Sequence, residues 1–213
     1  MSEDPYALKT IEDLRRIIPT FKPQSEALRQ RLNDYMDAFS AEFINDSPMV
    51  FVGTCSRDGH VDVSLKGDAP GFVVLRDTKT LLLPERAGNT EARGLSNLLE
   101  HKKISLLFVV PRAMEVLRVT GSAEVTRDPK LLDKLSALGK PALICIKITV
   151  EECFFHCGRA VNRSHLWKPE KWPAQSGKYQ MRQISARKKI NLDELEEMGR
   201  QALKEMGEAD GAY

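Results

Sequence analysis

Apolar residues change their spacing near residue 49 of this 213-residue chain. Before that point they recur at helical spacing, first over residues 8–18 in a run that ends at Pro19. Asp4 is a typical helix N-cap and Pro5 is typical of the first helical position, so the pattern predicts a helix that begins there. A second helix is predicted from about Ser25 to the sequence NDSP.

From residue 49 onward, short apolar runs and alternating runs predict strands. Asp58-Gly59 marks a hairpin between the first two, and Gly121 marks a bulge or a close backbone approach. The second strand, HVDVSLK, alternates, with Val61, Val63 and Leu65 on one face and His60, Asp62, Ser64 and Lys66 on the other. The segments are 49–55, 60–66, 72–77, 80–84, 103–111, 115–128 and 142–157.

Helices are predicted at 89–100, near 129–138, and at 192–206 behind Asn191. The strand segments follow one another with little alternation between strand and helix, which indicates an antiparallel barrel, taken as six-stranded, with helices on its outside. We therefore divide the chain into a helical extension packed on the barrel at 1–46, a barrel domain at 47–175, and a linker with a C-terminal helix at 176–213.

Composition and charge narrow the possible partners and compartment. Apolar residues make up 42% of the chain and charged residues 29%, as in an ordinary globular protein. A formal net charge of +2 gives no electrostatic case for nucleic acid or an anionic membrane, so we expect neither partner. No apolar run of about eighteen residues exists, and the acidic N-terminus lacks the apolar core of a signal peptide. The four cysteines form no CxxC motif, and we predict a cytoplasmic protein.

The stretch LLLPERAGNTEARGLSNLLE, residues 81–100, places Arg86, Gly88 and Asn89 between a buried strand and a helix. If the helix begins at Asn89, the N–H groups of its first turn form a site where phosphate binds readily. Arg86 adds a planar fork of donors, and Gly88 lets the backbone approach closely. Ser64 and Lys66 would join them if strand 60–66 lies beside strand 80–84. A capped helix with a solvated arginine, beside an outward strand face, explains the same residues.

Three sequence blocks occur in an order and spacing that are similar to those of a known family: VDVSLKGDAPGFV, TLLLPERAGNTEARGLSNLLEHKKISLLFVVP and ECFFHCGRAVNRSHLWKPEKW. They resemble the pyridoxamine 5'-phosphate oxidase-related flavoproteins, and within these the FMN-dependent enzymes of unassigned substrate, over residues 10–175 or so. The chain departs from the family pattern at Leu65, where proline is common. It also departs at Glu85-Arg86 and Ala87, where Asp-Arg and proline are typical.

The resemblance implies a mainly β fold with flanking helices: a six-stranded antiparallel split β-barrel that binds FMN, with helical N- and C-terminal extensions. It also implies a homodimer with the flavin at the subunit interface. By position, it assigns the isoalloxazine ring and the ribityl chain to Val63, Ser64, Leu65 and Lys66. It assigns the ribityl phosphate to Leu83, Pro84, Arg86, Gly88 and Asn89, with Arg93 and Asn97 nearby, and brings Arg163 and Trp167 from the partner chain.

The function that the resemblance implies is an FMN-dependent oxidoreductase. It would transfer electrons or hydride between a reduced nicotinamide nucleotide or small substrate and an acceptor, and no catalytic side chain can be named. Two alternatives stay open: a non-catalytic barrel that binds, stores or senses FMN, and a barrel that uses deazaflavin or haem. An open substrate pocket over the flavin would separate the two: Arg159, Arg163, His165 and Trp167 would line it in an enzyme and close it in a binding protein.

Two further clusters have ordinary explanations beside functional ones. Cys153, His156 and Cys157 alternate between strand faces and lack a fourth ligand, so we expect no metal. Cys157 could be a redox thiol or a small apolar residue. Trp167 and Trp172 either form an aromatic wall over a ligand or pack on the barrel. The chain has no dinucleotide fingerprint, no Walker loop and no nucleophile elbow.

Overall fold

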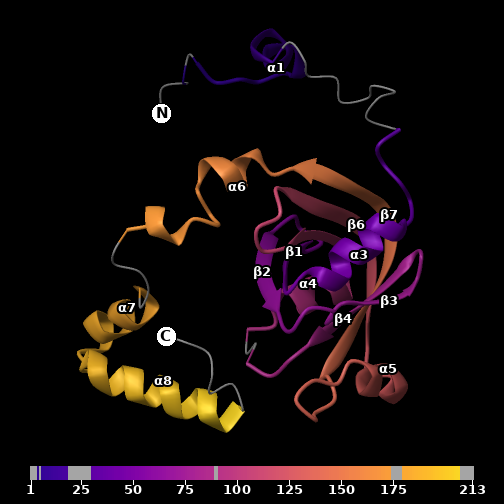
Figure 1. Ribbon diagram of the computed structural model, residues 1–213. Coiled ribbons are helices and arrows are strands. Elements are labelled where there is room, and N and C mark those ends of the chain that lie inside the picture. The colour runs from indigo at the N-terminus through magenta and orange to yellow at the C-terminus, as the bar shows by residue number, and fades with distance from the viewer. Residues whose placement is uncertain (1–3, 5, 19–29, 89–90, 174–178, 207–213) are drawn as a thin grey trace.

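The computed structural model of the chain describes residues 4, 6–18, 30–88, 91–173 and 179–206 (Figure 1). Seven strands in these residues form one antiparallel sheet in the order β2-β1-β5-β6-β7-β4-β3. The strands are β1 Met49–Cys55, β2 Val61–Gly67, β3 Val74–Asp77, β4 Thr80–Glu85, β5 Lys103–Val109, β6 Glu115–Thr126 and β7 Ile144–Cys157.

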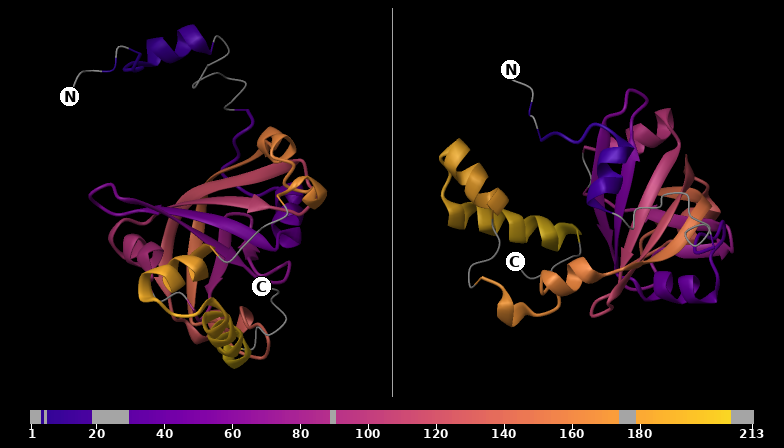
Figure 2. Two further views of the ribbon diagram at one scale, coloured as in Figure 1. Left: turned by 90° about the vertical axis from the view of Figure 1, so that its left-hand side faces the viewer. Right: turned by 90° about the horizontal axis from the view of Figure 1, so that it is seen from above.

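The long strands β6 and β7 curl the sheet into an incomplete barrel (Figures 1 and 2). The mainly β split-barrel architecture expected from the sequence is confirmed. The sheet has one strand more than the six expected for the barrel: β3, a strand of four residues within the predicted segment 72–77, pairs with β4 at the edge of the sheet. The domain boundaries at residues 46 and 175 stay a prediction.

The predicted hairpin and the predicted close approach are both present. β1 and β2 pair from Met49 with Gly67 to Cys55 with Val61, and Gly59 has φ of 89° in the turn between them. At Gly121 the register of β6 against β7 shifts, and a Cβ there would overlap the Thr149 carbonyl oxygen. Glycine is therefore required at residue 121 because another backbone occupies the space of a side chain.

The core lies inside the curled sheet. Its largest fully buried side chains are those of Phe108, Met36, Ile44, Leu81, Leu83, Leu106, Leu117, Ile148, Val50, Val73 and Val119, whereas Leu82 is buried in a second apolar cluster with Leu132 and Leu135. Helix α3, Ala38–Asp46, covers one opening of this core, with Ile44 buried and Phe43 in edge-to-face contact with Phe155.

Helix α3 begins at Ala38, not near Ser25 as predicted. Asp37 caps it by accepting the Ser40 N–H at 2.8 Å. The backbone of Asn33 instead bonds to Cys153 of β7, with N–H···O distances of 3.1 and 2.7 Å, and the Met36 N–H donates to the Thr78 carbonyl at 2.7 Å, so residues 30–37 are not helical. The rest of the predicted segment, 25–29, lies outside the described residues.

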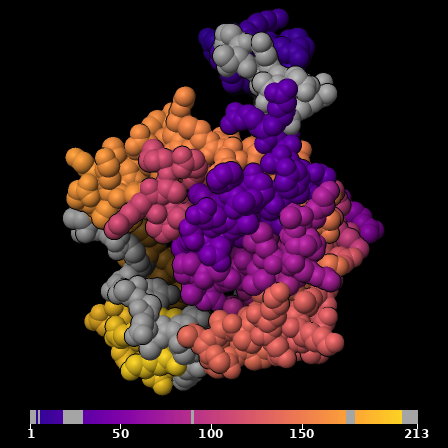
Figure 3. Space-filling view, turned by 45° about the vertical axis from the view of Figure 1, so that its right-hand side comes forward, coloured from indigo at the N-terminus to yellow at the C-terminus, as the bar shows by residue number. Residues whose placement is uncertain are grey.

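The first helix, α1, spans Ile11–Ile17 and begins later than Asp4-Pro5. Thr10 and Asp13 form a capping box, which satisfies the first backbone donors of the helix and sets its start. No residue of α1 is buried, and the helix lies apart from the sheet (Figures 1 and 3).

The remaining helices connect or follow the strands. They are α4 Arg93–Glu100, α5 Pro129–Lys134, α6 Arg159–Arg163, the 3₁₀ turn Pro169–Lys171, α7 Tyr179–Lys188 and α8 Leu192–Met206. The C-terminal helix matches its prediction, and Asn191 accepts the Asp193 N–H at 2.8 Å. Helix α5 is shorter than the predicted 129–138, and α7 lies in the segment predicted as a linker.

Helices α7 and α8 lie beside the sheet (Figure 2). Within the described parts of the chain, no helix has the length and apolarity needed to cross a membrane.

Candidate functional site

A cavity of ≈ 1020 Å³ opens where β2 and β4 end. Its walls come from three parts of the chain: the end of β2 with the loop after it, the end of β4 with the segment after it, and the turn that follows α5. The residues that line it are Ser64, Leu65, Lys66, Gly67, Asp68, Phe72, Pro84, Glu85, Arg86, Ala87, Gly88, Ala137, Leu138, Lys140, Pro141 and Leu143. This volume lies at the upper end of the range for small-molecule sites.

Strand β2 turns its polar residues toward the inside of the barrel. Val61, Val63 and Leu65 are 77%, 65% and 57% exposed, whereas Ser64 and Lys66 on the opposite face are partly buried. The predicted alternation is therefore present, with the apolar face pointing outward. This orientation delivers the Lys66 ammonium to the cavity wall.

Lys66 and Glu85 form a largely buried ion pair in that wall. The Lys66 Nζ donates to both Glu85 carboxylate oxygens, at 2.6 and 2.7 Å, and the two side chains are 14% and 6% exposed. A buried pair of this kind is costly to break, because removal of one partner leaves a charge in a low-dielectric setting.

Arg86 is held by the loop after β2 and by the end of α5. Its Nε donates to Asp68 Oδ2 at 3.0 Å, its Nη2 lies 3.0 Å from the same oxygen, and its Nη1 donates to the Leu135 carbonyl at 2.6 Å. The Arg86 side chain is 28% exposed, so the guanidinium lies at the cavity surface. Arg86 therefore lines the cavity, with a carboxylate of the same chain on one side of its fork.

The predicted helix start at Asn89 is not what the described residues show. Helix α4 begins at Arg93, behind Ala92, which has a left-handed φ of 48° and makes no side-chain cap. Asn89 itself lies outside the described residues. Gly88 has φ of 108°, and among the described residues no atom lies within 4 Å of the place that a Cβ would take. The backbone conformation, rather than a close approach, therefore favours glycine there.

The cavity brings together six of the residues expected at the flavin: Ser64, Leu65, Lys66, Pro84, Arg86 and Gly88.

Leu83 is fully buried in the core, and Val63 lies on the outer face of β2. Arg93 forms an exposed ion pair with Glu91 at 2.9 Å, and Asn97 donates to Thr54 Oγ1 at 3.0 Å. Arg163 ends α6, and the Trp167 Nε1 donates to the Ala113 carbonyl at 3.1 Å. Their roles at a flavin stay predictions.

One wall of the cavity was not foreseen from the sequence. Ala137 and Lys140 exchange two backbone hydrogen bonds of 2.9 Å around Leu138 and Gly139, which have φ of 51° and 73°. The sequence LGKP carries a turn signal that could have marked this segment. Leu138 is 79% exposed in a conformation that is unusual for a non-glycine residue. Within the described chain, Lys140 has no carboxylate at ion-pair distance.

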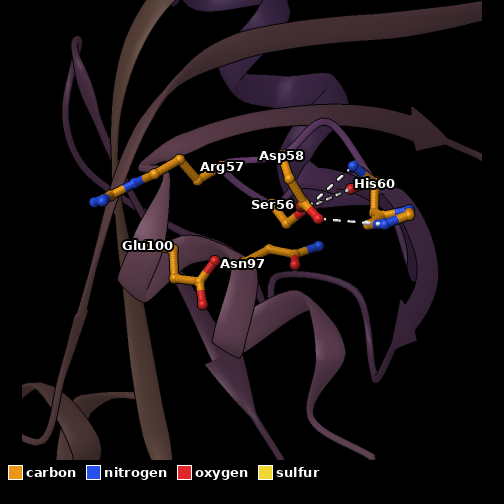
Figure 4. Close-up of a pocket in the computed structure, with 6 residues that line it drawn as sticks. All are labelled: Ser56, Arg57, Asp58, His60, Asn97 and Glu100. Atoms are coloured by element: carbon orange, nitrogen blue, oxygen red, sulfur yellow. Dashed lines mark hydrogen bonds and ion pairs between the residues drawn. The ribbon is translucent and has the colours of Figure 1, made fainter.

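A second, smaller hollow lies beside the β1–β2 turn and α4 (Figure 4). Its lining is Ser56, Arg57, Asp58, His60, Asn97 and Glu100. Ser56 donates to Asp58, and this hydrogen bond is the main cause of the lowered pKa of the Asp58 carboxyl. The His60 Nε2 lies 3.3 Å from Asp58, and both side chains are largely exposed. These contacts close the turn and do not build a nucleophile–base pair, because the serine bonds the carboxylate and not the imidazole.

The cysteines and tryptophans near the end of β7 have mainly structural contacts. Burial raises the pKa of the Cys153 thiol, and it raises that of Cys145 to about 11, so both stay protonated and apolar at neutral pH. Cys157 is exposed. The Trp172 Nε1 donates to the His165 carbonyl at 2.9 Å. Among the residues that the structure describes, no group of three or more His, Cys, Asp or Glu side chains could hold a metal ion.

Fold and site together define a split-barrel protein with a cavity of mixed polar and apolar lining, which contains two ion pairs and lies where two non-adjacent strands end. A family model described as pyridoxamine 5'-phosphate oxidase matches residues 36–157, more than half of the chain. The chain belongs to this family. No match was found among curated proteins.

Several solved structures are similar to this chain. A variant of HupZ from Group A Streptococcus is 20% identical, with a TM-score of 0.48 over 57% of this chain and 99% of that one. A Clostridium acetobutylicum protein of the pyridoxinephosphate oxidase family, related to general stress protein 26, is 21% identical, with a TM-score of 0.42 over 56% and 86%. An FMN-binding protein from Syntrophomonas wolfei is 13% identical, with a TM-score of 0.42 over 68% and 95%.

Proposed function

We propose that this protein is an FMN-dependent oxidoreductase that acts on a small molecule as a cytoplasmic homodimer. The observation that carries the proposal is the cavity in which Ser64, Lys66 and Arg86 meet at the ends of β2 and β4. Family membership gives the expectation of a flavin phosphate, and the cavity supplies a place with matching chemistry.

The lining of the cavity suits FMN in both of its parts. Lys66, Arg86 and Lys140 contribute three positive charges, against two negative charges from Asp68 and Glu85. One positive charge is therefore in excess, which favours a phosphate. Phe72, Pro84 and Leu143 supply apolar surface for an aromatic ring system.

Arg86, Lys140 and the backbone at Gly88 would hold the phosphate, and Ser64 and Leu65 would contact the remainder of the ligand. Bound FMN would supply the electron-transfer chemistry of its ring. The chain's own contribution is to bind and orient the flavin and to limit access of water from the apolar side of the cavity. Lys66 is held by Glu85 and would act mainly as a positioned hydrogen-bond donor.

The outer face of β2 supports a homodimer. Val61, Val63 and Leu65 are exposed in a row, and Phe51 and Leu107 extend this apolar strip across β1 and β5 because Phe51 pairs with both Leu65 and Leu107. Exposed apolar patches of this kind mark interaction surfaces. A second copy would cover the strip next to the cavity and bring Arg163 and Trp167 toward it.

Titration of the purified protein with FMN, followed by anaerobic addition of NADH or NADPH, tests the proposal. We expect binding of FMN, weakening by about 1.5–3 kcal/mol in Arg86→Ala, and bleaching of the flavin absorbance by a reduced nucleotide or a small reductant. Binding without reduction by any donor would favour a storage or sensing protein. Absence of FMN binding, with uptake of deazaflavin or haem, would contradict the proposal.

A further inference from the structure

We infer that Asp68 is a built-in competitor for the anion that Arg86 binds, so that a phosphate-bearing ligand enters the cavity by displacing a carboxylate. The inference rests on the proposed function, that is, on a phosphate group binding in this cavity. It adds a specificity-determining residue to this cavity.

Asp68 is fixed in a position to compete. It follows β2 directly, and its backbone N–H donates to the Pro48 carbonyl at 3.1 Å. Its Oδ1 accepts the Ala69 N–H at 2.8 Å, which leaves Oδ2 directed at the Nε and Nη2 of Arg86. Both side chains are about three-quarters shielded, at 23% and 28% exposed, so solvent and salt screen their attraction less than at an open surface.

Arg86 can change partners without losing its position. Its Nη1 donates at 2.6 Å to the carbonyl of Leu135, which is buried in the second apolar cluster of the protein. That contact is on the other branch of the guanidinium from the Asp68 contacts. A phosphate oxygen prefers the same forked donor geometry that Asp68 now uses. Phosphate binding on the Nε–Nη2 side therefore requires Asp68 to give way.

The exchange concerns Arg86 and leaves the other cation of the wall in place. Lys66 is paired with Glu85 through both carboxylate oxygens, and that pair is more deeply buried than Arg86–Asp68. Ligands without a phosphate gain nothing at Arg86 that would offset the loss of Asp68. Asp68 thus lowers the affinity of the cavity for FMN but not for riboflavin, which need not displace it, and so sets how strongly the cavity prefers FMN.

The test compares FMN and riboflavin binding in the full chain with Asp68→Asn, which keeps the shape of the side chain and removes its charge. We expect the dissociation constant for FMN to fall about tenfold, because a charge-assisted competitor is removed, and that for riboflavin to stay within about twofold. Asp34→Asn is the matched control, because Asp34 pairs with Lys79 away from the cavity. In an Arg86→Ala background, Asp68→Asn should have lost its effect on FMN.

Three results would overturn the inference: no change in FMN affinity in Asp68→Asn, equal tightening for FMN and riboflavin, or the same gain with and without Arg86. Each of these presupposes a wild-type protein that binds FMN, so the proposed function would stand. A wild-type protein that binds neither flavin would contradict the proposed function itself, and the exchange would fail with it.

Discussion

Lys66 and Glu85 join two strands that are not neighbours in the sheet. Lys66 lies on β2, at one edge, and Glu85 ends β4, next to the strand at the opposite edge. The Lys66 ammonium lies 2.6 and 2.7 Å from the two carboxylate oxygens of Glu85. The ion pair thus links β2 to β4, which share no backbone hydrogen bonds in the described sheet, and it forms part of the cavity wall.

Glu85→Gln should destabilise the protein strongly, because it leaves the Lys66 ammonium largely buried without its counter-charge. We expect a loss of about 3–5 kcal/mol in the free energy of unfolding, measured by chemical denaturation. The double variant Lys66→Met with Glu85→Gln should recover much of this loss, since it removes the orphaned charge.

The exposed pair between Lys79 and Asp34 is the control for this experiment, with side chains that are 54% and 67% exposed. Lys79→Met should change stability by less than about 1 kcal/mol. Equal losses in the free energy of unfolding for Glu85→Gln and Lys79→Met would mean that the Lys66–Glu85 pair stabilises the barrel no more than an exposed ion pair does.

The sheet was predictable because its signals are local. Alternation over residues 60–66, Asp58-Gly59 in the first turn and the apolar runs of the long strands each determine a strand or a turn from neighbouring residues. Helix α8 and its cap at Asn191 were predictable for the same reason.

The predicted and observed helix starts differ where contacts between residues distant in the sequence, or a second capping sequence, determine where a helix begins. Asn33 pairs with Cys153, which lies far along the chain, and so is not part of the predicted helix, while the capping box of Thr10 and Asp13 starts α1 at Ile11. At the cavity, Lys66 and Arg86 could be predicted from the sequence because lysine and arginine are the residue types that bind anions. The carboxylates that face them, Asp68 and Glu85, come from the meeting of separate strand ends, which no spacing in the sequence reports.

Lys140 should contribute to anion binding because it lines the cavity and, unlike Lys66 and Arg86, has no ion-pair partner among the described residues. Lys140→Met should weaken FMN binding by about threefold to tenfold, with little effect on riboflavin, since an exposed charge is partly screened. Added salt should reduce the difference between the variant and the wild type. Lys130→Met, on α5 and outside the cavity lining, is the control. Equal weakening for both flavins would assign Lys140 a structural role.

Asp37 makes the stability of the fold depend on acid pH. The Ser40 backbone N–H that it accepts at the start of α3 holds the pKa of the Asp37 carboxyl below its ordinary value of 3.8. A lowered pKa in the folded state means that the stabilisation is fully present above the unfolded value. It is lost as pH falls from about 3.8 through the folded pKa.

Asp37→Asn separates the charge of this cap from its hydrogen bond, because asparagine also caps helices. We expect the variant to be less stable than the wild type by about 0.3–1 kcal/mol at neutral pH, as measured by thermal unfolding. The difference should vanish once the pH lies below the folded pKa. A difference that stays constant down to the lowest accessible pH would show that the charge of Asp37 is not the cause.

The apolar strip on the outer face of β2 predicts that the protein is a dimer in solution. Val61 is 77% exposed and lies outside the cavity lining, so Val61→Glu places a charge in the proposed interface without touching the ligand wall. We expect the dimer dissociation constant in sedimentation experiments to rise at least about a hundredfold, because an unpaired carboxylate would be buried. Flavin content should fall with dissociation, since the partner chain supplies part of the proposed site. Met198→Glu, at a position on α8 that is 65% exposed, should leave both measurements unchanged. A wild-type monomer that holds flavin tightly would contradict both the interface and the shared site.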